Sequence, residues 1–210
     1  MLLLLARQSA CSFFNSVYLS TARVKPMMPE TPSFSDAIAM TQALLRELEN
    51  KHSNEKPDDR ADDLAIAQTV TQLMSTKASA RGFLATLLTY DGAIADHPPA
   101  GIIEGLQAQP EQSADLIAKN LAMSSAMVVV HQRNHDHENF AGSRRVQQRT
   151  RQLIEQLSMI ELNQAIDEMI SSLDGTSDRY QPFFNQQSYD NEQREELKKV
   201  FESLNLSAQS

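Results

Sequence analysis

The residues best suited to chemistry by type and spacing are two histidines, His131 and His135, which are four positions apart. On a helix they would share a face, which is the geometry that two imidazoles need to bind one transition metal. His97 is a third candidate ligand, but Gln132 stands where a metalloprotease helix carries its glutamate general base. The alternative is that a long helix leaves the core and that its polar end carries solvated histidines.

A group of arginines follows, in an interval whose only acids are Asp136 and Glu138. In a protein of net charge −8, such a positive strip is expected to contact an acidic protein surface or a phosphate-bearing molecule such as RNA. Phe140 is the single Phe, Tyr or Trp between the first and the last of these arginines, too few to stack successive bases, so nucleic acid is not the favoured partner. Alternatively the arginines pair with the protein's own acids, as Arg151 would with Glu155. The candidate interaction surface consists of Arg133, Arg144, Arg145, Arg149 and Arg151.

A third group lies in residues 90–99, where Asp91, Asp96 and His97 occur close together. An acid and an imidazole could transfer protons in catalysis. This segment offers no nucleophile with an orienting neighbour, however, and an aspartate before two prolines is typical of a helix N-cap. We therefore assign no catalytic residue.

The numbers and positions of glycine and cysteine residues exclude several classes of binding site. Only six glycines occur, and none cluster as a phosphate-binding loop requires. Gly101 and Gly105 form a G-x-x-x-G pattern, which predicts close packing of two helices. The single cysteine, Cys11, excludes an internal disulfide and a cysteine-based zinc cage and fits a reducing compartment. We expect no cofactor, and the negative net charge disfavours general attraction to nucleic acid or anionic membranes.

The first 29 residues differ from the rest, because they contain no Asp or Glu but include Arg7, Arg23 and Lys25. This composition is typical of an organellar transit peptide. The apolar run 2–6 is too short for a secretory signal or for a membrane span, which needs about 20 apolar residues. Alternatively, translation begins at Met27 or Met28, or the segment is a disordered tail. We predict a non-core extension over residues 1–29, and a cytoplasmic location unless residues 1–26 are a transit segment.

Helices are the elements expected to position these groups. The chain has no Trp and 6% aromatic residues, while Ala, Leu, Gln and Glu are plentiful, which favours helix. Apolar residues recur three and four positions apart along the chain. We predict an all-α fold, a compact bundle of about seven helices forming one domain over residues 30–208, without β-sheet.

The spacing predicts a first helix over about residues 35–50 and leaves open whether residues 64–90 form one helix or two. A helix beginning at Pro110 is expected to be the longest, and either ends at Gly142 or continues to Leu157. After a predicted capping box of Ser158 with Glu161, a helix ends at Asp174-Gly175. A polar, aromatic loop then leads to Asp190, which is expected to cap the last helix.

Four segments carry a family resemblance: Arg81-Gly-Phe-Leu-Ala-Thr-Leu-Leu-Thr, Asp96-His-Pro, Lys119-Asn-Leu-Ala-Met-Ser and Gly142-Ser-Arg-Arg-Val. In this order they resemble a family of uncharacterised helical proteins of oxygenic photosynthetic bacteria. The resemblance covers about Met28 to Asn205. It implies a cytoplasmic bacterial protein and brings no assigned activity, so it transfers no functional residue.

The sequence thus favours a non-enzymatic helical protein that binds another macromolecule, most simply a protein, through a surface around residues 131–151. One alternative is a metal-binding helical protein that uses His131 and His135. A second alternative is binding of RNA or a phosphate-bearing ligand through Arg144, Arg145, Arg149 and Arg151.

Overall fold

Helices joined by short turns make up the part of the chain that the computed structural model describes, residues 31–52 and 59–207. This part contains no β-strand, which confirms the predicted all-α class. The predicted extension over residues 1–29 lies outside the described residues. In chain order the elements are α1 (Phe34–His52), α2 (Asp59–Leu73), α3 (Lys77–Thr89), the 3₁₀ helix η1 (Ala93–Ala95), α4 (Ala100–Gln107), α5 (Pro110–Arg133), α6 (His137–Leu157), α7 (Ile160–Leu173), α8 (Gln181–Gln187) and α9 (Asn191–Ser207).

The described part contains nine α-helices, more than the roughly seven predicted, because two apolar stretches each form two helices and a predicted loop contains a further one. Thr76 begins α3, since its hydroxyl accepts the backbone N–H of Ser79 at 3.1 Å, and so separates α3 from α2. Residues 134–136 separate α5 from α6, so Gly142 lies inside α6. The third difference is α8, which replaces the predicted loop and buries Phe184 completely.

Helix α1 packs against α3 through Ala37, Thr41 and Leu45, all of which are fully buried. The Thr41 hydroxyl donates to the Ala37 carbonyl at 2.6 Å, so a polar side chain is accommodated in this contact. Before the helix, the Ser33 hydroxyl accepts the N–H of Asp36, and the Asp36 carboxylate accepts the N–H of Ser33. This reciprocal cap fixes the start of α1, one residue before the predicted one.

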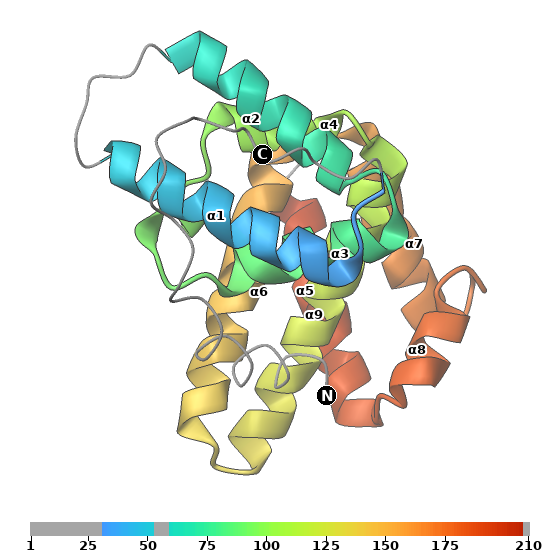
Figure 1. The fold of residues 1–210 in the computed structure, drawn as a ribbon. Coiled ribbons are helices and arrows are strands. Elements are labelled where there is room, and N and C mark those ends of the chain that lie inside the picture. The colour runs from blue at the N-terminus through green and yellow to red at the C-terminus, as the bar shows by residue number, and fades with distance from the viewer. Residues whose placement is uncertain (1–30, 53–58, 208–210) are drawn as a thin grey trace. The chain divides into compact units, whose positions relative to one another are not determined.

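The G-x-x-x-G pattern brings α4 against α2 (Figure 1), as predicted. A Cβ atom added at Gly105 would stand 2.5 Å from the Cβ of Val70, and one added at Gly101 would meet the carbonyl oxygen of Asp63. The Gly101 N–H also donates to the Asp63 carboxylate at 3.0 Å. The two backbones therefore lie closer than any side chain at these positions would allow.

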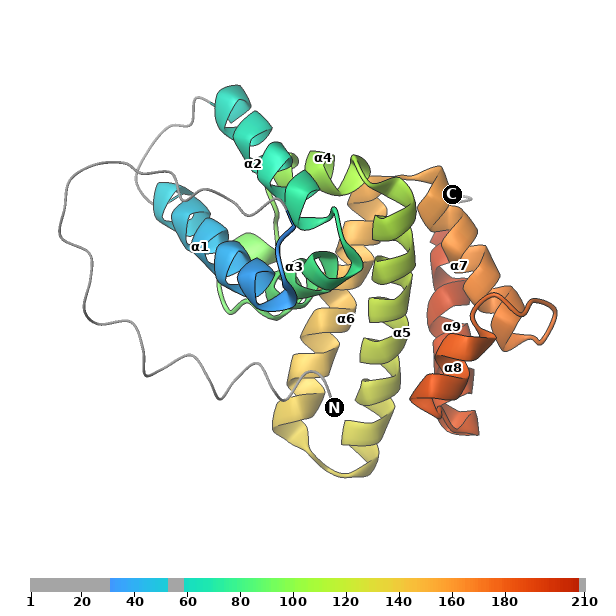
Figure 2. The ribbon, with the colours of Figure 1, turned by 45° about the vertical axis from the view of Figure 1, so that its right-hand side comes forward.

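Helix α5 is central, because it contacts α3, α4, α6, α7 and α9 (Figure 2). Small side chains permit these close contacts, and the amide of Gln147 on α6 donates to the buried hydroxyl of Ser125 at 2.9 Å. Among the described helices, α5 alone is long and apolar enough by composition to cross a membrane. Its apolar window is 61% buried against the other helices, as expected for a core helix.

The last three helices are set by turn chemistry that the sequence predicted only in part. Asp190 caps α9 as expected, since its carboxylate accepts the Gln193 N–H at 2.9 Å while the Gln193 side chain accepts the Asp190 N–H. Asp174-Gly175 ends α7, and Gly175 has a φ of 75°. The predicted capping box at Ser158 is wrong: Ser158 ends α6 in the left-handed conformation, and α7 begins after Met159 without a side-chain cap.

Candidate functional site

The turn between α5 and α6 separates the two candidate metal ligands. Helix α5 ends at Arg133, and His135 has a φ of 54°, in the left-handed region. The prediction that His131 and His135 share a helical face is therefore wrong. His131 is largely buried, and its Nδ1 lies 3.5 Å from a carboxylate oxygen of Asp136, whereas His135 is exposed.

Asp136 explains why the helix is interrupted here. Its carboxylate accepts the backbone N–H of Asn139 at 3.2 Å and the Asn139 side-chain amide at 2.7 Å, so it caps α6. These hydrogen bonds lower the pKa of the Asp136 carboxyl. His97 lies in the connection between η1 and α4, and the described residues contain no group of three His, Cys, Asp or Glu placed to hold a metal ion.

Arg149 is buried rather than part of a surface, with a side chain that is only 3% exposed. Its Nε donates to the Asp96 carboxylate at 2.7 Å, and its Nη1 donates to the carbonyl oxygens of Leu88 and Tyr90 at 3.1 and 2.5 Å. These carbonyls end α3, where a cation also complements the helix dipole. The prediction that Arg149 belongs to the interaction surface is therefore wrong, because the residue is buried in the contact between α3 and α6.

The same contact explains Asp96, which does not cap α4 as expected. Pro99 occupies the N-cap position of α4 and makes no side-chain cap hydrogen bond. Asp96 instead accepts from Arg149, and this hydrogen bond lowers the pKa of the Asp96 carboxyl. An ionised Asp96 paired with a buried guanidinium has a structural role in the contact between η1 and α6.

Arg133 and Arg151 also contact the protein's own helices. Arg133 pairs with Asp190 at 2.9 Å and with Glu192 at 2.7 Å, joining the end of α5 to the start of α9. Arg151 donates to the Ser203 hydroxyl at 2.9 Å, rather than pairing with Glu155. These two arginines contact α9 from α5 and α6, although the Arg133 side chain is itself 47% exposed.

Arg144 and Arg145 are the candidates that face solvent. Arg144 is exposed, and no hydrogen bond or ion pair joins it to any residue in the described part of the chain. Arg145 pairs with Asp91 at 2.9 Å, but the two side chains are 45% and 85% exposed. Such an exposed pair contributes little and exchanges readily for a partner's acid. On α6 the predicted strip thus reduces to two adjacent positive charges at the surface, while the exposed Arg133 at the end of α5 is held in two ion pairs.

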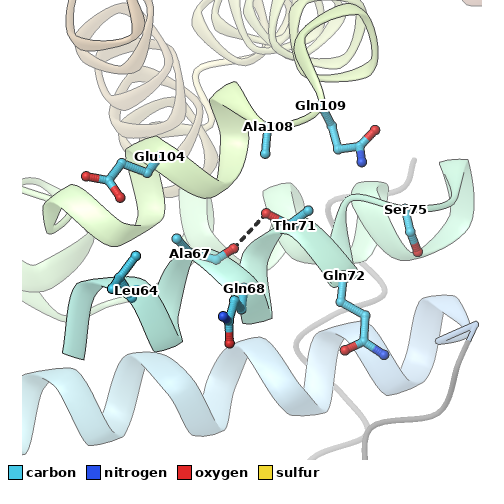
Figure 3. A pocket seen from close by; sticks show the side chains of 9 residues that line it. All are labelled: Leu64, Ala67, Gln68, Thr71, Gln72, Ser75, Glu104, Ala108 and Gln109. Atoms are coloured by element: carbon cyan, nitrogen blue, oxygen red, sulfur yellow. Dashed lines mark hydrogen bonds between the residues drawn. The ribbon is translucent and has the colours of Figure 1, made fainter. Parts of the chain in front are cut away.

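A groove between α2 and α4, which sequence reasoning missed, has a volume of about 510 Å³ (Figure 3). Leu64 stands at one end and is 55% exposed. A sequence signal was available, because residues 64–76 contain no charged side chain although the outer face of α2 is exposed. The groove is lined by Leu64, Ala67, Gln68, Thr71, Gln72, Ser75, Glu104, Ala108 and Gln109.

The fold and these sites define an all-helical protein with a tightly packed central helix, two adjacent positive charges on α6, and a groove between α2 and α4 in which Glu104 is the one charged lining residue. The chain belongs to the family described as Uncharacterised conserved protein UCP020893, which matches residues 33–204. This confirms membership of an uncharacterised family over nearly the range that the resemblance covered, while the expected occurrence in oxygenic photosynthetic bacteria stays a prediction. No curated protein and no solved structure matches the chain.

Proposed function

We propose that this protein acts by binding an acidic surface of another protein through the exposed face of α6. The observation that supports this proposal is Arg144, an exposed cation without a partner in the described residues, next to Arg145, whose ion pair is open to solvent. The chain as a whole has a net charge of −8, so two adjacent exposed cations form a positive patch on a negatively charged protein. Arginine forks bind carboxylates with two parallel hydrogen bonds, which favours an acidic protein surface as the ligand.

The surroundings of the two arginines support a rigid contact surface. Arg149 ties the middle of α6 to the end of α3, and Gln147 ties it to α5, so the backbone that carries both arginines is fixed from two sides. Because the backbone that carries the two arginines is already ordered, less conformational entropy is lost when a partner binds. In Figures 1 and 2 the turn between α5 and α6 lies at the far end of this helix pair from α2 and α4.

The test is affinity purification of the tagged full chain from its native cells, followed by mass spectrometry. The variant carries Arg144→Glu and Arg145→Glu, and omits Arg149 because replacing that buried residue would disturb the fold. The matched control carries Arg46→Glu and Lys199→Glu, which reverses two exposed charges on α1 and α9 and changes the net charge equally. We expect one partner to be lost from the α6 variant and retained by the control, with both variants folded by circular dichroism.

Two results would contradict the proposal. The first is a bait that returns alone at several salt concentrations. The second is a partner that nuclease treatment removes and whose affinity falls steeply with salt, since that behaviour is typical of RNA bound through phosphates.

A further inference from the structure

From Leu64 onward, the outer face of α2 is unusual for a surface helix because it carries no charge. From Leu64 to Thr76 there is no Asp, Glu, Lys or Arg, while Leu64, Ala65 and Gln68 are exposed. Depletion of charge at the centre of a surface patch is the compositional mark of a protein–protein interface. Leu64, Gln68 and Gln72 recur at helical spacing, so they form one ridge along α2, and Ser75 follows in the turn after the helix.

Helix α4 supplies the other wall of the groove beside this ridge (Figure 3). Ala67 on α2 and Ala108 after α4 are small, and the two glycines of α4 keep the helices close together. A neighbouring helix can therefore place its own ridge in the groove, as in ordinary helix packing. We propose that this helix is α2 of a second copy of the chain, so that α2 and α4 of two copies form a symmetric interface.

The polar groups of the groove fit a second copy. In the described structure the side-chain amides of Gln68 and Gln109 make no hydrogen bond. An amide carries both donors and an acceptor, so it can pair with an identical group across a twofold axis, whereas a charged group would meet its own charge. Glu104 lies on the α4 wall and is the one charged residue of the lining, so α2 provides the contact nearest the axis.

Opposite charges flank the uncharged stretch, the acidic ones on α2, where Asp62 also pairs with Lys51 and Asp63 accepts the Gly101 N–H, and the basic ones on α3. Asp62 and Asp63 precede the uncharged stretch, and Lys77 and Arg81, both exposed and without partners in the described part, follow it. A twofold axis between Thr69 and Val70 makes the two α2 helices antiparallel, so the acidic end of each copy faces the basic end of the other. A parallel arrangement would instead place like charges together. The charge pattern therefore selects a second copy in an antiparallel orientation.

The size of the patch predicts a weak dimer. At 1.5 Å per residue, the 15 residues of α2 and the 8 of α4 measure about 22 and 12 Å. With a helix width of about 10 Å they present roughly 350 Å² per copy, below the approximately 800 Å² of a stable complex. Dimerisation is thus expected in the micromolar range or weaker, and it does not depend on the function proposed for α6.

The test is analytical ultracentrifugation of the full chain from about 1 to about 500 µM, which spans the expected affinity. The variant Gln68→Glu places two like charges close to the axis, and Gln148→Glu, at an exposed position on α6, is the matched control. We expect the average mass of the wild type and of the control to rise toward the dimer with concentration. Gln68→Glu should weaken association by about tenfold or more.

A mixture of two variants tests the symmetry directly. Gln68→Glu and Gln68→Lys should each stay largely monomeric but associate when mixed, because opposite charges then meet near the axis. A wild type that stays monomeric over the whole range overturns the proposal, whatever binds to α6. A dimer that Gln68→Glu leaves unchanged also overturns it, because the interface then lies elsewhere.

Discussion

Replacing Arg149 by methionine is the sharpest test of how the fold is held together. Methionine preserves most of the apolar volume of the arginine stem and has a similar helix propensity, so the change removes mainly the guanidinium. The guanidinium makes one hydrogen bond to the Asp96 carboxylate and two to the carbonyl oxygens of Leu88 and Tyr90. All three bonds join α6 to the end of α3 or to the segment after it.

The expected loss of unfolding free energy follows from these partners. A buried carbonyl left without a donor costs about 1 to 3 kcal/mol, and this applies fully to Leu88 and partly to Tyr90, whose oxygen is less buried. The Asp96 side chain is 46% exposed and is rehydrated when Arg149 is lost, so the ion pair adds at most about 1 kcal/mol. The total is about 3 kcal/mol, a large share of the roughly 5 to 15 kcal/mol of an ordinary domain.

Urea unfolding followed by circular dichroism measures this difference. The matched control is Arg144→Met on the same helix, which removes an exposed arginine without a partner in the described residues and should change stability by less than about 0.5 kcal/mol. Raising the salt concentration should leave most of the difference intact, because carbonyl hydrogen bonds in a buried contact are little screened. The reasoning is refuted if Arg149→Met and Arg144→Met unfold at the same urea concentration.

Two further variants and one titration extend these tests. Gly105→Ala should destabilise the protein by about 1 to 3 kcal/mol, because its new Cβ would press on Val70. Gly142→Ala, where no atom lies within 4 Å, should stabilise it by about 0.5 to 1 kcal/mol; equal effects in urea unfolding would refute close packing of α2 and α4. The Asp96 pKa lies below its ordinary 3.8, so its stabilising contribution is complete above that value and disappears as the pH falls through the lowered pKa. An NMR titration should show this pKa returning toward 3.8 in Arg149→Met, and an unchanged pKa would contradict the Arg149–Asp96 contact.

The sequence was sufficient for the fold class because helical spacing is a local property. The spacing of Leu45, Val70 and Leu153 identifies buried faces, and all three residues are buried in the structure. The interruptions were harder to predict. Thr76 and Asp136 each offer a cap that competes with continued helix, and whether the cap or the continued helix wins depends on how the following helix packs.

Much of the candidate site could not be predicted, because charge type and spacing do not reveal burial. Arg149 belongs to the same sequence pattern as Arg144 and Arg145, yet its partners Leu88 and Tyr90 are about sixty positions away. In both, the acceptor is a backbone carbonyl, which leaves no trace in the amino-acid pattern. The groove beside α2 had a sequence signal in its missing charges, but only the position of α4 shows that this surface is hollow.

Arg149 meets its three partners across 53 to 61 positions of the chain. Closing so long a loop costs chain entropy before any of these bonds forms, so we expect the contact to appear late in folding, after α5 has packed. A contact that forms after the transition state of folding slows unfolding without speeding folding. Stopped-flow experiments on Arg149→Met should therefore show faster unfolding with a nearly unchanged folding rate. A slower folding rate instead would mean that the end of α3 and the middle of α6 meet early and guide the remaining helices into place.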